Sequence, residues 1–261
     1  MEINLKNKQA LVCGSTSGIG KAIAIELAQS GASVTLLARN EDKLKKVLES
    51  LPSSDNQTHT YAVADFQNPK EILQIAKKLS KEQTYHILIN NTGGPKGGAL
   101  LNASNDEFIE AFTMHILANQ TLAQHIVPGM KKLGYGRIIN IISTSVKQPI
   151  DGLGVSNTIR GAMGSWSKTM ANELGQYGIT VNNVLPGFTA TQRLDEIIKT
   201  RAKRDAITEE KVAEQMKSQV PAKRFASPNE VAYAAVFLSS PVAQYINGVN
   251  LPVDGGRTKS L

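Results

Sequence analysis

Short runs of apolar, mostly β-branched residues alternate along the chain with longer segments of helical periodicity. The short runs predict strands at 9–12, 33–37, 61–63, 86–90, 137–142, 179–185 and 248–253. Helical patterns begin near six residues: Ile19, Glu41, Pro69, Ser104, Val155 and Pro228. This alternation is typical of βαβ units, whose right-handed crossovers build a doubly wound parallel sheet. We therefore expect an α/β fold with a parallel sheet of about seven strands and helices on both faces.

One segment, 191–225, interrupts this rhythm. It holds two charged helical stretches that lead into no strand, and it follows the sixth expected strand, where it could fold over a cleft. We interpret it as a helical lid. No linker, repeat or low-complexity tract divides the chain, so we expect residues 1–261 to form one domain.

Composition removes several classes of protein. The single cysteine, Cys13, allows no disulfide within the chain, and the four histidines are scattered, so we expect no metal site. No uncharged apolar run approaches the length of a membrane span, and the first residues lack the apolar core of a secretory signal. We expect a cytoplasmic protein that does not enter a membrane.

The net charge of +7 would suit an acidic partner but does not identify one. Basic residues concentrate between Arg193 and Arg204, where acidic residues interrupt them, and this pattern favours a solvated helix face. Nucleic-acid binding would need a continuous basic stripe or a platform of aromatic side chains, and neither is present. We rank nucleic acid last among the partners and expect none.

A glycine-rich stretch follows the first expected strand and leads directly into a helix. Gly14 suits a tight turn, Gly18 a close approach of the backbone to a pyrophosphate, and Gly20 close packing of helix on strand. Ser15 and Ile19 lie in the same loop. Unpaired amides at a helix start attract phosphates, so the loop predicts a dinucleotide site, although a merely flexible loop is the simpler alternative.

The second expected strand runs into Arg39 rather than into the acidic residue that usually holds the adenosine ribose. A guanidinium there can bind a 2′-phosphate in bidentate fashion. We therefore predict NADP as the cofactor and NAD as the less favoured alternative. An ordinary surface arginine is the competing interpretation.

The combined motifs resemble the short-chain dehydrogenase/reductase family over nearly the whole chain, and within it the 3-oxoacyl-acyl-carrier-protein reductases. The resemblance implies a Rossmann-like fold, with Asp65 and Phe66 beside the adenine and Asn91 and Gly93 beside the adenosine ribose. It also implies that Thr191 contacts the nicotinamide amide or the phosphates. The motifs that carry the resemblance are the glycine loop, Ala64-Asp65-Phe66, Asn90-Asn91-Thr92-Gly93, the stretch from Asn182 to Thr191, and Val253-Asp254-Gly255-Gly256.

The resemblance breaks at the residues that carry the chemistry. Members of the family have a serine, then Tyr-x-x-x-Lys, and an asparagine on the preceding helix. Here Ser143 occupies the serine position, but Ser156 and Arg160 replace the tyrosine and lysine, and His115 replaces the asparagine. An aliphatic hydroxyl is a poor acid near pH 7, and arginine stays charged. Arg160 can still stabilise a developing oxyanion, and His115 could supply a proton through water.

Three hypotheses follow. The first is an NADP-dependent oxidoreductase that acts on a carbonyl or alcohol, including a 3-oxoacyl thioester, with Ser143, Ser156, Arg160 and His115 at the reacting atom. The second is an NADP-binding module, a silent subunit or sensor, that has lost turnover. The third, nucleic-acid binding, is the weakest. Apolar stripes and small residues on the helices near 104–132 and 155–176, together with the resemblance, predict a homodimer or homotetramer.

Overall fold

The computed structural model describes residues 3–54 and 56–260 and contains a seven-stranded sheet in which all paired neighbours run parallel. The strand order is β3-β2-β1-β4-β5-β6-β7, so the expected doubly wound α/β fold is confirmed. The strands are β1 (Gln9–Cys13), β2 (Ser33–Ala38), β3 (Thr60–Val63), β4 (Ile87–Asn90), β5 (Gly136–Ile141), β6 (Ile179–Pro186) and β7 (Asn250–Val253).

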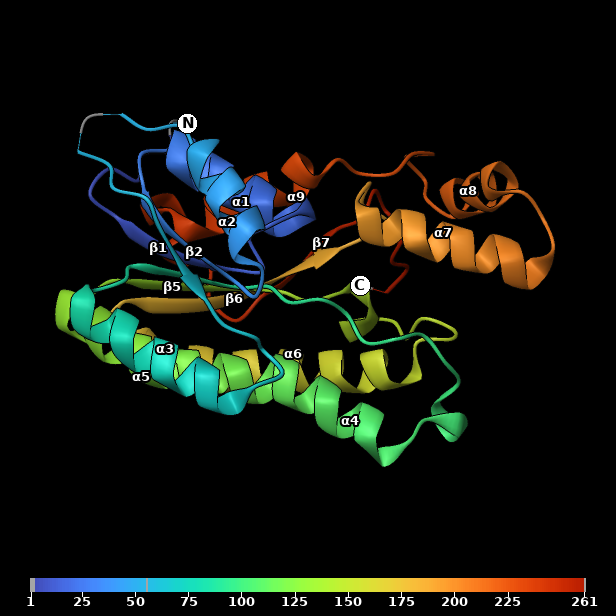
Figure 1. Cartoon of the computed structure of the whole chain (residues 1–261), viewed down its shortest axis with the longest axis horizontal. Helices are drawn as coiled ribbons and strands as arrows, with labels where there is room; N and C mark the ends of the chain where they lie inside the picture. The colour runs from blue at the N-terminus through green and yellow to red at the C-terminus, as the bar shows by residue number, and fades with distance from the viewer. Residues whose placement is uncertain (1–2, 55, 261) are drawn as a thin grey trace.

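Helices cover both faces of the sheet, as Figure 1 shows. The helices are α1 (Gly18–Gln29), α2 (Glu41–Glu49), α3 (Pro69–Glu82), α4 (Asn105–Phe112), α5 (Ala118–Leu133), α6 (Gly154–Leu174), α7 (Gln192–Asp205), α8 (Glu209–Ser218) and α9 (Pro228–Ser239). One apolar cluster joins α1, α2 and α9 to the sheet, and a second joins α3, α5 and α6 to its opposite face. Burial on both faces explains why the strands read as apolar runs rather than as alternating patterns.

Side-chain caps mark where several helices begin. Asn40 and Asn68 accept backbone N–H groups of α2 and α3, and the capping boxes of Ser104 and Ser227 begin α4 and α9. Ser104 and Pro228 therefore lie at helix starts, as the sequence predicts. The helix expected after Ser104 is not uniform, because a π-helical segment, η2 (Thr113–Leu117), connects α4 to α5.

The segment between β6 and α9 forms α7 and α8, which extend beyond the end of the sheet (Figure 1). These two helices have an apolar cluster of their own, which includes Leu194, Ile198, Val212 and Met216. A parallel bridge between Thr189 and Ala226 joins the two ends of the segment. The segment is thus a helical unit tied at its base.

No helix in the described part of the chain combines the length and the apolar character needed to cross a membrane. Within the same ranges, no three His, Cys, Asp or Glu side chains gather as metal ligands would.

Candidate functional site

The site lies where the chain reverses direction across the sheet. From β1 the chain continues to β2 and β3 on one side, while β4 lies on the other side of β1. The loops after β1 and β4 therefore leave a crevice at the carboxyl ends of the strands, the usual place for a ligand in such sheets. Asn91 joins the two loops, because its Nδ2 donates to the carbonyl of Cys13 at 3.3 Å and to that of Gly14 at 3.2 Å.

The glycine loop after β1 needs its glycines. Gly14 has φ +58°, and a Cβ there would lie 2.5 Å from the carbonyl oxygen of Asn91. Gly18 has φ +54°, and a Cβ there would lie 3.2 Å from Cγ2 of Thr191. The N-terminus of α1 has no side-chain cap, so its first N–H groups remain for a ligand. These features fit the phosphates of a dinucleotide.

One cavity, which we call the Arg39 cavity, has a volume of about 670 Å³ and opens beside the ends of β1, β2 and β4. A Cβ at Gly93 would meet no atom within 4 Å, so the backbone there faces open space. Arg39 is exposed and sits directly after β2. Six of the cofactor residues predicted from the sequence line this cavity, namely Gly14, Arg39, Asp65, Phe66, Asn91 and Gly93.

A second cavity, the Ser143 cavity, has a volume of about 380 Å³ and shares Gly14, Asn91 and Gly93 with the Arg39 cavity. The two cavities therefore adjoin at the glycine loop. The other predicted residues that line the Ser143 cavity are Gly18, Ile19, Thr191, Ser143, Ser156 and Arg160. A molecule that lies along both cavities would have one end at Arg39 and the other beside these polar groups.

Three predicted residues line neither cavity. A Cβ at Gly20 would overlap the carbonyl oxygen of Gly14, so this glycine permits close packing of α1. Ser15 is fully buried, and its hydroxyl has no hydrogen-bond partner among the described residues. His115 is also buried, and Thr92, which its ring contacts, lines the Ser143 cavity.

Two hydroxyl groups face the Ser143 cavity from different elements. Ser143 follows β5 and begins the short helix η3 (Thr144–Val146), where its Oγ accepts the N–H of Ser145 at 3.1 Å. This bond uses a lone pair and leaves the O–H free to donate. Ser156 lies in the first turn of α6 and is 9% exposed. Both hydroxyls are donors for an oxygen atom placed in the cavity.

Arg160 brings a positive charge to the same cavity from one turn further along α6. Its Nη1 donates to the carbonyl of Ile141 at 3.3 Å, while its Nε has no partner within the described ranges. Burial lowers the pKa of Arg160 to about 10, so the side chain remains a cation at neutral pH. An unpaired buried N–H on a cation is costly unless a ligand or water satisfies it.

His115 lies in the π-helical segment η2, a type of turn that is frequent at functional sites. Its Nδ1 is 2.7 Å from Oγ1 of Thr92, in the loop after β4. Burial lowers the pKa of His115 to about 2, and the charge of Arg160 adds to the effect. The imidazole is therefore neutral at physiological pH. Its Nε2 is buried and has no partner in the described part of the chain.

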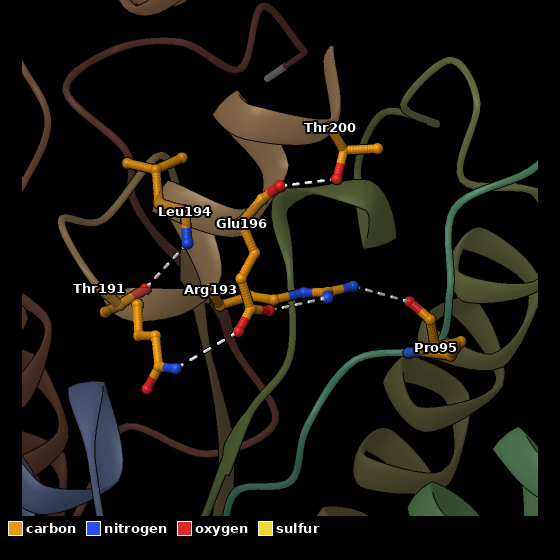
Figure 2. Close-up of polar contacts among 7 residues, drawn as sticks. Pro95, Thr191, Arg193, Leu194, Glu196 and Thr200 are labelled. Carbon is orange, nitrogen blue, oxygen red and sulfur yellow. Dashed lines mark hydrogen bonds and ion pairs between the residues drawn. The ribbon is translucent and has the colours of Figure 1, made fainter. Parts of the chain in front are cut away.

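Segment 191–225 contacts the loop after β4, and residues of both line the Ser143 cavity. Nη2 of Arg193, in α7, donates to the carbonyl of Pro95 at 3.2 Å, and Figure 2 shows this bond reaching across from one segment to the other. The same guanidinium approaches Glu196 at 3.5 Å. Oγ1 of Thr191 accepts the N–H of Leu194 and so caps α7.

Sequence reasoning missed the roles of Thr92 and Arg193. Thr92 directly follows the strand-end asparagines, so its place at the carboxyl edge of the sheet was a usable signal. Arg193 lies within a mixed run of charges and gives no such signal.

Comparisons with known proteins match this architecture over nearly the whole chain. A family model described as Enoyl-(Acyl carrier protein) reductase matches residues 14–258. "NADPH-dependent reductase BacG" of Bacillus subtilis is 31% identical, with 98% of this chain and 100% of that protein covered. "3-oxoacyl-[acyl-carrier-protein] reductase FabG" of Vibrio cholerae is 35% identical, with 97% and 98% covered. The crystal structure of L-sorbose reductase from Gluconobacter frateurii, complexed with NADPH and L-sorbose, has a TM-score of 0.94 at 31% identity, and both chains are covered completely.

Proposed function

The chain belongs to the short-chain dehydrogenase/reductase family, and from that premise we propose that it is an NADP-dependent oxidoreductase acting on a carbonyl or the matching alcohol. What supports this most directly is the continuity of the Arg39 and Ser143 cavities. Similar proteins include reductases whose names or titles specify NADPH. The substrate is a small carbonyl compound, and an acyl thioester stays among the candidates.

The residues of the Arg39 cavity would hold the dinucleotide. We assign the 2′-phosphate to Arg39, because a guanidinium offers paired N–H donors and no carboxylate stands at the end of β2. The free amides at the start of α1 suit the pyrophosphate, with Ile19 in the first turn of that helix and Ser15 in the loop before it. Asp65 and Phe66 would border the adenine, Asn91 and Gly93 the ribose, and Thr191 the nicotinamide end. When bound, NADPH supplies the hydride.

The reacting oxygen of the substrate would lie among Ser143, Ser156 and Arg160. Reduction of a carbonyl builds negative charge on this oxygen, and donors fixed in advance stabilise that charge without reorganisation. The O–H of Ser143 is free to donate, and Arg160 adds a cation with an unpaired Nε–H. Neither serine is an acid near neutral pH. A serine that passes its proton to the oxygen must therefore receive another proton from water.

His115 takes a different part in this proposal from the one its ordinary pKa suggests. Because burial keeps the imidazole neutral, it supplies a hydrogen-bonding atom, Nε2, rather than the proton of an imidazolium. Its bond to Thr92 fixes the ring. We propose that His115 orients water near the reacting oxygen, so that it acts as a positioning residue.

The second candidate is an NADP-binding module without turnover, which is favoured by Ser156 and Arg160. Within the described residues no tyrosine lines the Ser143 cavity, so no phenol is available there as a proton donor. A positioned general acid contributes about 10² to 10⁴ in rate. This protein would therefore be slow or inactive unless Ser143, Ser156 and Arg160 compensate.

Two measurements on the purified protein separate the candidates. The first is the dissociation constant for NADP, and the second is NADPH oxidation across a panel of ketones, oxo acids and acyl thioesters. Binding together with oxidation supports the oxidoreductase, whereas tight binding without oxidation supports the module. Failure to bind either pyridine nucleotide at millimolar concentration would contradict both.

A further inference from the structure

A third cavity, the Arg257 cavity, lies outside the nucleotide site and has a volume of about 620 Å³. Segments that are far apart in the sequence enclose it: the loop 148–152 before α6, helix α7 with Gln219 just after α8, and the C-terminal tail 257–259. Figure 1 shows the end of the chain beside the loop that leads into α6. The N–H of Lys259 donates to Oε1 of Gln148 at 3.2 Å, which ties the tail to this loop.

The lining is strongly basic. Arg201, Arg204, Arg257 and Lys259 face it, and Asp151 is its single acidic residue among those described. Such a lining raises the local concentration of anions.

Two of the arginines form no ion pair among the described residues. Arg201 and Arg257 are half-buried, and in the described part of the chain neither forms an ion pair or donates a side-chain hydrogen bond. Burial lowers the pKa of Arg257, and the charge of Arg201 lowers it further against the opposing charge of Asp254. Both guanidinium groups face the same cavity, where a bound anion would offset their positive charge.

Arg257 is also held in place. Its guanidinium lies over the ring of Phe188 at 4.2 Å from the centroid. The preceding turn is fixed by Asp254, whose Oδ1 accepts the N–H of Gly256 at 3.0 Å and whose Oδ2 accepts that of Thr258 at 2.7 Å. A guanidinium that is positioned before binding loses less freedom when it pairs with a carboxylate or phosphate. Arg204 differs, because it already pairs with Asp205 at 2.7 Å.

Residues adjacent in the sequence line the Arg257 cavity and the Ser143 cavity. Ser143 and Leu153 line the Ser143 cavity, and their sequence neighbours Thr144 and Gly152 line the Arg257 cavity. On α7, Ile197 lines the Ser143 cavity and Arg201 the Arg257 cavity, a step of one helical turn or about 6 Å along the axis. A substrate that bridges this step would have its carbonyl beside Ser143 and its far end beside the arginines.

We infer that the Arg257 cavity binds an anionic group of the substrate, a carboxylate or a phosphate, through Arg201 and Arg257. This inference rests on the proposed function, since the carbonyl of the same molecule would react beside Ser143. It narrows the substrate to an acidic carbonyl compound whose charge is separated from the carbonyl by several bonds. A neutral ketone would leave both guanidinium groups unpaired.

The first experiment needs no turnover. Glutarate and inorganic phosphate are titrated separately into the protein saturated with NADP, at constant ionic strength, and binding is followed by calorimetry. We expect at least one anion to bind, and Arg201→Gln or Arg257→Gln to weaken it about tenfold or more, as the loss of a charged hydrogen bond predicts. Preference for glutarate indicates a carboxylate, and preference for phosphate a phosphoryl group.

Lys199→Gln is the matched control, because Lys199 is exposed on α7 and does not line the cavity. We expect it to change anion affinity by less than about twofold, as isolated surface charges usually do. Arg257→Lys, which keeps the charge, should retain part of the binding if Arg257→Gln proves unstable. Absence of binding by both anions overturns the inference, and so does an equal loss in the Lys199 variant.

The second experiment compares an oxo acid with its methyl ester as substrates. We expect kcat/KM to favour the acid in the natural protein and this preference to disappear in Arg257→Gln, with the dissociation constant for NADP unchanged. Equal kcat/KM values for the acid and the ester would contradict the inference while supporting the proposed function. Anion binding without any NADPH oxidation would support the subsite and contradict the proposed reaction.

Discussion

Nδ1 of His115 lies 2.7 Å from Oγ1 of Thr92, and this contact joins the π-helical segment η2 to the loop after β4. The pair therefore connects a buried helical turn with a loop that lines the Ser143 cavity. Because the ring is buried, its protonation state follows from the fold rather than from the pH of the solution.

The buried imidazole should make the folded protein sensitive to acid. Burial lowers the pKa of His115 from its ordinary value of 6.5 to about 2, so below pH 6.5 the unfolded chain binds a proton there that the native state does not. The contribution of the neutral His115 to the free energy of unfolding is fully present above this pH. It is lost as the pH drops, by at most about 1.4 kcal/mol per pH unit. Urea unfolding at pH 7.5 and at pH 5 measures the loss, which should be smaller in His115→Asn.

Burial also lowers the pKa of His86, to about 4, so His86 adds to the acid sensitivity. Because His86 remains in His115→Asn, the difference between the two proteins measures the effect of His115 alone. A second variant, His125→Asn, controls for the loss of any histidine on the same helical run. An equal pH dependence in the natural protein and in His115→Asn would contradict the prediction.

Restoring the family's acid should raise turnover. Ser156→Tyr together with Arg160→Lys supplies a phenol beside an ammonium on one face of α6, and we expect kcat/KM to rise by about 10² to 10⁴. Each single variant serves as a control and should gain much less. If the double variant binds NADP but turns over no faster, the NADP-binding module becomes the better hypothesis.

Arg39 should determine the choice between the two cofactors. Arg39→Gln removes the charged donor at the end of β2, so the dissociation constant for NADPH should rise about tenfold to a hundredfold while that for NADH stays nearly constant. Fluorescence titration of both nucleotides measures the ratio. Lys43→Gln, an exposed change on the neighbouring helix α2, should leave both constants as they are. An unchanged ratio in Arg39→Gln would refute this role.

The bond from Arg193 to Pro95 should hold segment 191–225, the proposed lid, against the loop after β4. Arg193→Ala removes it, and we expect KM for the carbonyl substrate to rise about threefold to tenfold, with faster proteolysis of 192–218. Lys199→Ala, also exposed on α7, should alter neither quantity. Equal rates of proteolysis in the natural protein and in Arg193→Ala would contradict the proposal that this bond holds the segment in place.

A homodimer or homotetramer should form through the helices on one side of the molecule. Ile109 and Phe112 are 62% and 42% exposed on α4, and the small residues Gly161 and Ala162 of α6 also face outward. A charge there, as in Ile109→Glu, should shift the mass towards the monomer because it would be buried on association. Light scattering gives the mass, with Lys43→Glu, an exposed change on helix α2 of the opposite face, as control. A monomeric natural protein at micromolar concentration would refute the prediction.

The strands and most helix starts could be predicted because local chemistry determines them. Apolar runs placed β1 to β6 within one or two residues, and Ser104 and Pro228 mark helix starts in the sequence as in the structure. The last strand begins at Asn250 rather than at 248, because Gly248 has φ +72° and cannot be part of an extended strand. A periodicity near 3.6 could not reveal η2, because a π-helical stretch of five residues, Thr113–Leu117, is too short to show a period of its own.

The site was less predictable wherever it depends on contacts between distant segments. The glycine loop, Arg39 and Ser143 follow strands and could be placed from their position in the sequence. The neutrality of His115 comes from burial by several elements, and the contact of Arg193 with Pro95 spans 98 residues. The same reason hides the Arg257 cavity, whose walls come from separate stretches of the second half of the chain.

The bridge between Thr189 and Ala226 has a consequence for how this chain could be redesigned. The two strand-like ends lie side by side, and the helices between them carry their own apolar contacts, so residues 190–225 amount to an exchangeable cassette. Grafting the corresponding stretch from a relative, with Thr191 kept for the cofactor, would alter the wall that faces the substrate and leave the sheet and the glycine loop unchanged. Sequence changes within this segment can therefore alter which substrate binds while the sheet keeps its packing.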